Sequence, residues 1–424
     1  MRRCALLVRW LIVWAATQGP ARVNASPAGP RPGGEQQREL VVSPGSSVPT
    51  LTAALRLAPA HSRIVVRAGT YREPMILVDK PVTIEGQGWP IFLGGEHDGF
   101  RITADSVSLR GVVIRGVAPT AAEDRAAIRV SGSRGCTIEN NRLMDTFFGV
   151  YLARASGCRI SGNTIEGRAR SQGLSGNAIH SWNSSDLRID HNTISGHRDG
   201  IYLEFTGRSS ITGNRSRDNL RYGLHFMFSQ GCEYARNSFS RNGGGVAVMF
   251  SDSVLMRANR FEQNRGSAAY GLLLKELRDS RIEQNCFTDN TVGLWTEGTS
   301  RVTVRGNEFT RNGWALRVLG DATDNQFREN RFSGNTFDVG TAPGSNSNVF
   351  ENNYWDHYRG YDLDRDGYGD VPYLPVHLFS QMVQQNKPAL ILLHSFFIDL
   401  LDLAERVVPS LTPATMMDRQ PLMR

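Results

Sequence analysis

One triplet, an asparagine followed by any residue and then an apolar residue, recurs at nearly constant spacing along the chain. The successive steps are 22, 29, 22, 23, 22, 26, 22, 23 and 22 residues. The asparagines are Asn141, Asn163, Asn192, Asn214, Asn237, Asn259, Asn285, Asn307, Asn330 and Asn352, and after Asn214 the apolar position is held by Ser216. A regular period of this length is typical of repeat architectures, in which each repeat packs mainly on its neighbours. The spacing therefore predicts a solenoid built from coils of about 22 residues.

Each coil contains two further segments that look like short strands. About eight residues after most asparagines, Gly or Ala precedes alternating apolar residues, as in Gly149-Val-Tyr-Leu, and another apolar pair, such as Thr137-Ile138, precedes the asparagine. Alternation with a period of two places one side of a strand in a core and the other in solvent. Stacking such coils ~4.8 Å apart buries the apolar sides. We therefore expect an all-β, right-handed parallel β-helix, a pectin-lyase-like solenoid, with the asparagines stacked in one turn.

The N-terminus has the features of a cleaved signal peptide. Arg2 and Arg3 precede an apolar run at residues 4–16, and Val23-Asn-Ala25 fits a signal-peptidase site. The run is shorter than the ~20 residues that span a bilayer. We expect a signal peptide at 1–25, a flexible linker at 26–46, the β-helix with its N-terminal cap at 47–375, and an amphipathic helical tail at 376–424.

Both ends of the solenoid are expected to be closed, because an open strand edge invites aggregation. Residues 50–58 read as a short cap helix with Thr50 as its N-cap. A second helix is expected to begin at Pro388 and to end before Pro409. This segment either covers the last coil or docks on a membrane partner. If it docks, a chain that ends at Tyr373 should still fold.

The cysteines and the charge limit the function classes. Cys136 and Cys158 occupy the same register in adjacent coils, so they either form a disulfide or lie in the turn as two small residues. Cys232 is three coils further on, which argues against a thiolate cluster. The net charge is +7, but the arginines occur singly rather than with aromatics on one face. We expect no nucleic-acid partner.

An acidic loop near the end of the solenoid resembles a calcium loop. Four carboxylates surround a glycine turn, which lets oxygen ligands wrap a hard cation. They are Asp362, Asp364, Asp366 and Asp370. The twelfth loop position is Tyr373 rather than Glu, so the loop is not an EF-hand. An acidic turn without a metal is the alternative.

Two methionines and a histidine suggest a site for copper. In the glycine-led strands the residues between the apolar ones should face outward, which makes His225, Met227 and Met249 neighbours on one outer face. Extra residues at about 115–125, 167–175 and 263–268 should form loops that rim this face, and such insertions usually mark a binding side. Thioether and imidazole ligands suit transient binding of Cu(I). The alternative is that these residues bind no metal.

From about residue 47 to the end, the chain resembles the NosD family. Segments 66–73 and 80–86 are similar to the first coils of many pectin-lyase-like β-helices, and the narrower match lies at 353–373 and 401–413. The resemblance implies a periplasmic protein that helps to assemble the copper-sulfur centre of nitrous oxide reductase. It also implies a copper chaperone and an ABC transporter as partners. We expect the tail to contact the transporter's membrane subunit and so to hold the protein at the inner membrane.

The same fold also serves carbohydrate enzymes, so a lyase, hydrolase or epimerase is the alternative function. Such an enzyme needs converging acid and base groups. The outward residues His180, Tyr202 and Glu204 do not form a cluster of paired acids. A passive carbohydrate-binding solenoid would show an aromatic stripe, and the outward aromatics look scattered. We therefore expect a maturation factor that is not an enzyme.

Overall fold

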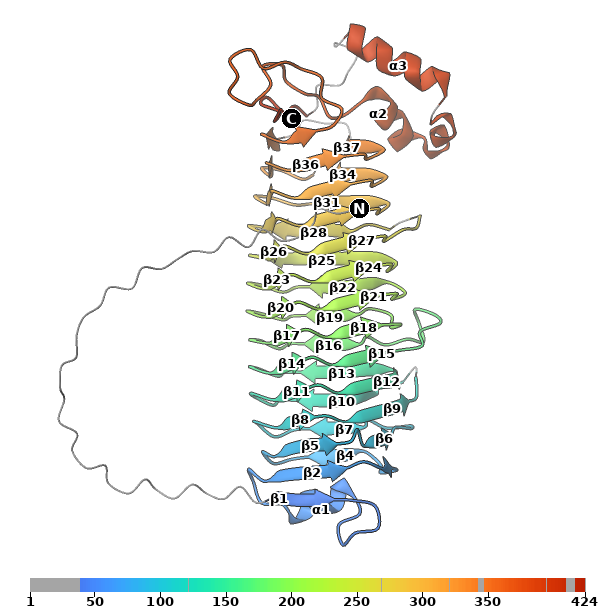
Figure 1. The fold of residues 1–424 in the computed structure, drawn as a ribbon, viewed down its shortest axis with the longest axis vertical. Helices are drawn as coiled ribbons and strands as arrows, with labels where there is room; N and C mark the ends of the chain where they lie inside the picture. Colours follow the sequence, from blue (N-terminus) through green and yellow to red (C-terminus); the bar gives the residue numbers. More distant parts are fainter. Residues whose placement is uncertain are drawn as a thin grey trace, which may run out of the picture. The chain divides into compact units, whose positions relative to one another are not determined.

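The computed structural model describes residues 39–423 apart from 121, 268, 320, 342–346, 394 and 409–415. The expected signal peptide at 1–25 lies outside the described residues. All described residues belong to one unit, which begins at Gln37. Within this unit the chain winds into a right-handed parallel β-helix whose three sheets run from coil to coil (Figure 1). The fold predicted from the repeat is confirmed.

Most coils contribute one strand to each of the three sheets, which hold 14, 13 and 12 strands, and each strand pairs in parallel with the equivalent strand one coil away. Sheet 1 holds the strands that precede the asparagines: β1 Glu39–Val42, β2 Arg63–Arg67, β5 Thr83–Gln87, β8 Ser108–Arg110, β11 Thr137–Glu139, β14 Arg159–Ser161, β17 Arg188–Asp190, β20 Ser210–Thr212, β23 Glu233–Ala235, β26 Leu255–Arg257, β29 Arg281–Glu283, β32 Thr303–Arg305, β35 Gln326–Arg328 and β38 Val349–Glu351. Sheet 2 holds the strands that follow the asparagines: β3 Thr70–Tyr71, β6 Ile91–Leu93, β9 Val113–Val117, β12 Arg142–Thr146, β15 Thr164–Glu166, β18 Thr193–Ser195, β21 Arg215–Arg217, β24 Ser238–Ser240, β27 Arg260–Glu262, β30 Cys286–Thr288, β33 Glu308–Thr310, β36 Arg331–Ser333 and β39 Tyr354–Trp355. Sheet 3 holds the glycine-led strands: β4 Ile76–Val78, β7 Phe100–Ile102, β10 Ala126–Ser131, β13 Phe148–Ala153, β16 Ile179–Trp182, β19 Ile201–Glu204, β22 Tyr222–Met227, β25 Gly244–Asp252, β28 Leu272–Arg278, β31 Val292–Glu297, β34 Trp314–Val318 and β37 Phe337–Thr341.

The turn between sheets 1 and 2 is held by a ladder of buried asparagines. The backbone N–H and Nδ2 of Asn163 both donate to Oδ1 of Asn192 at 3.0 Å. Asn192 repeats the pattern on Asn214, at 2.9 and 3.0 Å. The predicted stacking of these three residues is therefore confirmed. At the C-terminal end the ladder uses Asn353, to which Asn330 donates at 3.0 Å, and not the predicted Asn352.

The interior is a continuous apolar column, and its C-terminal half is a stack of aromatic rings from sheet 2. Neighbouring ring centroids lie between 4.1 and 5.6 Å apart. The stacked residues are Phe239, Phe261, Phe287, Phe309, Phe332 and Trp355. Each ring is almost completely buried. Because the same position in each coil faces the core, the third residue of the asparagine triplet becomes this stack.

The N-terminal end is closed by helix α1, Leu51–Leu57, as predicted. The Thr50 hydroxyl accepts a hydrogen bond from the Ala53 N–H at 3.2 Å, which is N-cap geometry. The Glu73 carboxylate accepts from the first two N–H groups of the helix at 2.8 Å each. Strand β1, residues 39–42, lies in the segment expected to be a flexible linker, where it pairs with β2 instead.

The C-terminal helices differ from the single helix predicted at 388–408. Three elements follow the last coil: α2 Leu378–Gln385, the 3-10 helix Lys387–Leu392 and α3 Phe396–Val407. Ser395 has an extended backbone and is the N-cap residue of α3, so it separates the 3-10 helix from α3. Phe379 and Val383 of α2 are buried in a cluster with Phe337 of the last sheet 3 strand. Helix α2 is therefore a cap on sheet 3.

The last residues return to the solenoid, which the sequence did not indicate. Asp418 lies next to Phe350 and Tyr373 in β-bridges, and it is fully buried. One of its carboxylate oxygens accepts from Nδ2 of Asn353 at 2.9 Å and from Nε1 of Trp355 at 3.0 Å. A chain that ends at Tyr373 would lose this closure, and the expectation that such a chain still folds stays a prediction.

One of the two alternatives for the cysteine pair is realised. Cys136 and Cys158 form a disulfide between adjacent coils, and their Cα atoms are 4.6 Å apart. The bridge links two consecutive coils at the turn just before their sheet 1 strands, β11 and β14. Cys232 is buried, and burial raises the pKa of its thiol to about 11.

Candidate metal centre

The outer face of sheet 3 brings the three predicted copper ligands together. Strands β22 and β25 pair in register, so Met227 lies opposite Met249 one coil away. His225 lies two residues before Met227 on the same side of β22. Loops around 118–125, 167–178 and 263–271 leave sheet 2 and enter sheet 3, where the sequence predicted insertions. The geometric part of the prediction, a shared face, therefore agrees with the structure.

The imidazole of His225 is buried rather than exposed, which corrects the expected surface grid. Its side chain is 6% exposed and meets the rings of Tyr202 and Tyr222 edge to face, with centroids 4.9 and 5.0 Å away. Nε2 is buried without a hydrogen-bond partner among the described residues. Leaving a buried polar nitrogen unpaired is costly, so this atom is a candidate ligand.

An ion pair behind the imidazole fixes its orientation. Nδ1 of His225 lies 3.3 Å from the Arg221 guanidinium and 3.9 Å from the Asp199 carboxylate, and Arg221 Nε donates to Asp199 at 2.8 Å. Burial raises the pKa of the Asp199 carboxyl, but hydrogen bonds from Arg221 and His225 outweigh it and hold the pKa below its usual range. Because a guanidinium can only donate, its 3.3 Å contact makes Nδ1 of His225 the acceptor and places the proton of the neutral imidazole on Nε2. A metal at Nε2 would need the other tautomer, with the proton on Nδ1 toward the Asp199 carboxylate 3.9 Å away.

The two thioethers are soft donors on the same face of sheet 3 as this histidine. Met227 and Met249 are half-buried, so both can be reached from solvent. The Tyr202 hydroxyl points at the sulfur of Met227 from 3.9 Å, and Met249 packs against a small cluster that contains Tyr270. Two thioethers and one imidazole suit Cu(I) better than a hard cation.

A stripe of three exposed phenylalanines borders the methionines, and sequence reasoning missed it. Phe205, Phe228 and Phe250 stack in successive coils with ring centroids 5.2 Å apart, although 41 to 49% of each residue is exposed. All three have φ near +50°, a left-handed backbone that bulky residues rarely adopt. Asn183 fills the same position one coil earlier. The outward aromatics are therefore not scattered, and we name these three residues the phenylalanine stripe.

The rings of His225 and Tyr202 belong to a second row on sheet 3, which continues toward the N-terminus as a stack of aromatic and imidazole rings. His180 lies between Tyr151 and Tyr202, with centroids 4.4 and 4.9 Å away. Burial lowers the pKa of His180 to about 3 and raises the pKa of Tyr202 to about 12. Neither group changes its charge near neutral pH. Beyond Tyr151, Arg101 and Arg129 line a hollow of about 530 Å³.

The predicted calcium ligands are only partly gathered. Asp362, Asp364 and Asp366 each bring a carboxylate oxygen within 4.8 Å of the others. Asp370 instead accepts the Leu363 N–H at 2.7 Å. The carboxylates of Asp362 and Asp366 also accept backbone N–H groups within the loop, as between Gly367 and Asp362 at 3.0 Å. The loop is therefore shaped by its own acidic residues, and three of the four expected ligands converge.

Helix α3 exposes a continuous apolar face. Its large apolar side chains at spacings of three and four residues are 52 to 80% exposed. They are Phe396, Leu400, Leu403 and Val407. The opposite side of α3 buries Ile398, and Glu405 holds His377 at 3.0 Å. No helix in the described part of the chain is long and apolar enough to cross a membrane.

Comparison with known proteins gives one family. The family model described as "Periplasmic copper-binding protein (NosD)" matches residues 166–362. Two relatives named "Probable ABC transporter binding protein NosD" come from Pseudomonas aeruginosa and Stutzerimonas stutzeri. They are 29% and 27% identical over 87% and 89% of this chain, and the matches cover 89% and 91% of their own lengths.

A solved structure supports the fold alone. The A-module of the mannuronan C-5 epimerase AlgE6 from Azotobacter vinelandii superposes with a TM-score of 0.50. The match covers 69% of this chain and 93% of the module, at 15% identity. Its likeness shows a shared β-helix and carries no information on activity. The family model over residues 166–362 and the two relatives, which match most of this chain, support membership of the NosD family.

Proposed function

We propose that this protein is a periplasmic accessory factor that holds copper transiently during assembly of the copper-sulfur centre of nitrous oxide reductase. One observation carries the proposal. Met227 and Met249 stand in register beside His225, whose Nε2 is buried without a hydrogen-bond partner among the described residues. Two of the three ligands are half-buried methionines with flexible side chains, which favours release over tight storage. The family's description as copper-binding supports copper as the cargo.

The phenylalanine stripe supports contact with a protein on the same face. Three exposed aromatic rings held in a strained backbone are costly for a chain that stays alone in solution. Aromatic residues are also the most common anchors of protein interfaces. We assign this surface to the copper chaperone that delivers the ion and then to nitrous oxide reductase, which receives it.

Helix α3 is proposed as the contact with the membrane subunit of an ABC transporter. Its outward apolar face is large enough to enter a hydrophobic groove, with anchors at spacings of three and four. The relatives' name, "ABC transporter binding protein", supports this partner. With export by the signal peptide at 1–25, the contact would hold the protein at the periplasmic side of the inner membrane.

The proposal does not include catalysis. A carbohydrate lyase or epimerase needs an acid and a base that titrate near the working pH. The ring row on sheet 3 offers His180 and Tyr202, whose pKa values of about 3 and about 12 are far from the working pH.

The acidic loop at Asp362, Asp364 and Asp366 is proposed as a weak calcium site. Calcium titration of the wild type and of Asp370→Asn would check this site.

The test is copper loading of the reductase in cells whose own copy of this protein is deleted. Cells that express the triple variant His225→Ala, Met227→Leu and Met249→Leu should yield reductase with little copper and little activity. Met144→Leu, a half-buried methionine on sheet 2, is the matched control and should load the enzyme normally. Equal copper per reductase in the triple variant and the wild type, with the variant shown to be folded, would remove the site.

A further inference from the structure

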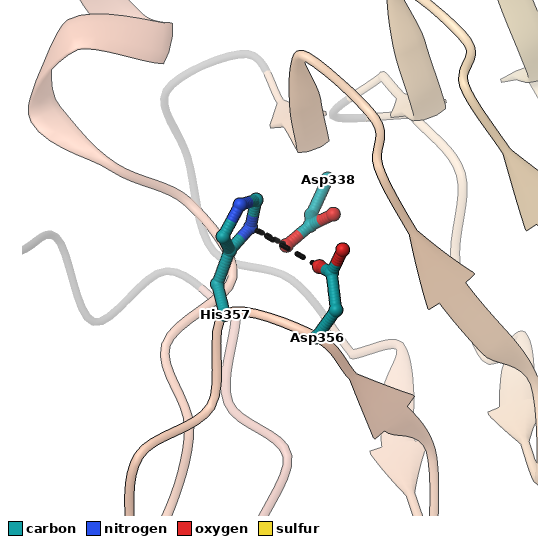
Figure 2. A group of neighbouring side chains, drawn as sticks. All are labelled: Asp338, Asp356 and His357. Carbon is teal, nitrogen blue, oxygen red and sulfur yellow. Dashed lines mark hydrogen bonds and ion pairs between the residues drawn. The ribbon is translucent and has the colours of Figure 1, made fainter.

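The second cluster of potential ligands lies at the C-terminal end of the solenoid, far along the chain from the methionines. Asp338 comes from β37, the last strand of sheet 3, whereas Asp356 and His357 follow directly after β39, the last strand of sheet 2. Nδ1 of His357 is 3.3 Å from Oδ2 of Asp338 and 3.4 Å from Oδ1 of Asp356. Figure 2 shows the two carboxylates and the imidazole turned toward one another.

The hydrogen bonds in this cluster leave two carboxylate oxygens unsatisfied. Asp338 is 2% exposed, and its Oδ2 accepts from His357 and from the Tyr373 hydroxyl at 3.1 Å. Its Oδ1 is buried, and no donor among the described residues reaches it. Oδ1 of Asp356 is likewise buried without a hydrogen bond from the described part of the chain. A buried, unpaired carboxylate oxygen is expensive, so the cluster is incomplete as a purely hydrogen-bonded one.

The charges are also unbalanced. Within the described ranges, neither carboxylate has an ion pair with lysine or arginine, and His357 is the one cationic partner of both. Arg359 is close, but its guanidinium donates to the backbone carbonyl of Asp356 at 2.7 Å and not to the carboxylate. Two carboxylates therefore face a single imidazole. A divalent cation bound by Oδ2 of Asp338, Oδ1 of Asp356 and the imidazole would restore neutrality and give the free oxygen of Asp356 a partner.

The donor set and its spacing define the class of ion. Tetrahedral zinc with ligand distances of about 2.0 to 2.1 Å places neighbouring donor atoms about 3.4 Å apart. The separations of 3.3 and 3.4 Å from Nδ1 match this value. Carboxylate oxygen and imidazole nitrogen suit Zn²⁺, whereas no thioether is present for Cu(I). We propose that Asp338, Asp356 and His357 bind one divalent ion of the zinc class, which replaces the proton on Nδ1 of His357.

The ion would join the last coil to the C-terminal helices. The Tyr373 hydroxyl, which donates to the ligand carboxylate of Asp338, lies 3.4 Å from Nε2 of His377. Nδ1 of His377 contacts Glu405 of α3 at 3.0 Å, and the same carboxylate accepts the Leu378 N–H of α2 at 2.6 Å. Such outer partners orient ligands and tune metal affinity. The site therefore has a structural role at the end of the solenoid, independent of the copper proposal.

The experiment uses the full mature chain, stripped with a chelator and titrated with Zn²⁺ by calorimetry. Co²⁺ serves as a spectroscopic probe of tetrahedral coordination. We expect one strong site in the wild type and an affinity at least about tenfold weaker in His357→Gln and Asp338→Asn. His357 is half-exposed, so its variant tests the site even if Asp338→Asn does not fold.

Two further variants make the assignment specific. Asp364→Asn, in the separate acidic loop, and the triple copper variant should both bind Zn²⁺ as the wild type does. Absence of a strong site in the wild type would overturn the proposal. Unchanged affinity in His357→Gln, or loss of the site in Asp364→Asn, would also overturn it.

Discussion

Asp418 takes the place of the next asparagine above Asn353. Its Oδ2 accepts from the backbone N–H and from Nδ2 of Asn353 at 3.1 and 2.9 Å, as Asn353 itself does from Asn330 at 2.9 and 3.0 Å. The ladder of amides thus ends in a carboxylate, which belongs to a residue 65 positions further along the chain than Asn353. The last turn of the solenoid is therefore closed by the far C-terminus.

Asp418→Ala should lower the free energy of unfolding by roughly 2 to 4 kcal/mol, because the buried donors of Asn353 and Trp355 lose their acceptor. Asp418→Asn keeps an acceptor oxygen and should lose less. Urea unfolding followed by circular dichroism measures both. If the alanine variant is as stable as the wild type, the closure described here does not contribute to stability.

Acid should destabilise the protein through two buried histidines. Burial lowers the pKa of His180 to about 3 and of His197 to about 4. In the unfolded chain both take up a proton near pH 6.5, so stability that is present above this pH is lost as the pH falls toward 4. Each histidine should cost about 2 kcal/mol at pH 5. The urea midpoint at pH 7.5 and 5 measures the loss, and His180→Phe should reduce it, while exposed His97→Gln should not.

Polar substitution of the phenylalanine stripe should separate stability from partner binding. Asn tolerates the left-handed backbone of Phe205, Phe228 and Phe250, and this gain offsets the lost ring stacking. We expect the triple asparagine variant to unfold within about 1 kcal/mol of the wild type. Its affinity for the copper chaperone should fall tenfold or more, measured by calorimetry. Equal affinity in variant and wild type would show that the stripe is not an interface.

Serine at Phe396, Leu400 and Leu403 should release the protein from washed membranes that contain the transporter. These side chains are at least half-exposed, so stability should change by no more than about 0.5 kcal/mol per site. Leu57→Ser, an equally exposed leucine at the other end of the solenoid, is the control. Retention of the α3 variant on the membranes, equal to that of the control, would contradict the assigned contact.

The repeat allowed the fold to be predicted because each coil satisfies the same local rules. A strand of alternating apolar residues and a stacking asparagine are visible in sequence without long-range information. A second buried ladder went unnoticed, although its signal was of the same kind. Asn219 donates to Asn242 at 2.9 Å and Asn242 to Asn264 at 3.5 Å, each five residues after the asparagine of the first ladder. Both ladders make slips of coil register costly.

The functional residues were harder to predict, for two physical reasons. Burial of His225 depends on Tyr202 and Tyr222, whose ring orientations the strand pattern does not specify. The phenylalanine stripe was missed because its residues sit in a left-handed turn, where aromatics are not expected. The zinc-class site joins Asp338 of sheet 3 to residues 356 and 357, which follow the last strand of sheet 2, so no spacing rule links them.

The central claim is that one Cu(I) ion binds His225, Met227 and Met249. X-ray absorption at the copper edge of the protein loaded with one equivalent of Cu(I) tests it most directly. The account predicts two sulfur neighbours and one imidazole nitrogen, with the sulfur signal lost in Met227→Leu with Met249→Leu and kept in Met144→Leu. A spectrum with only oxygen and nitrogen neighbours, or a sulfur signal that survives the double substitution, would contradict it.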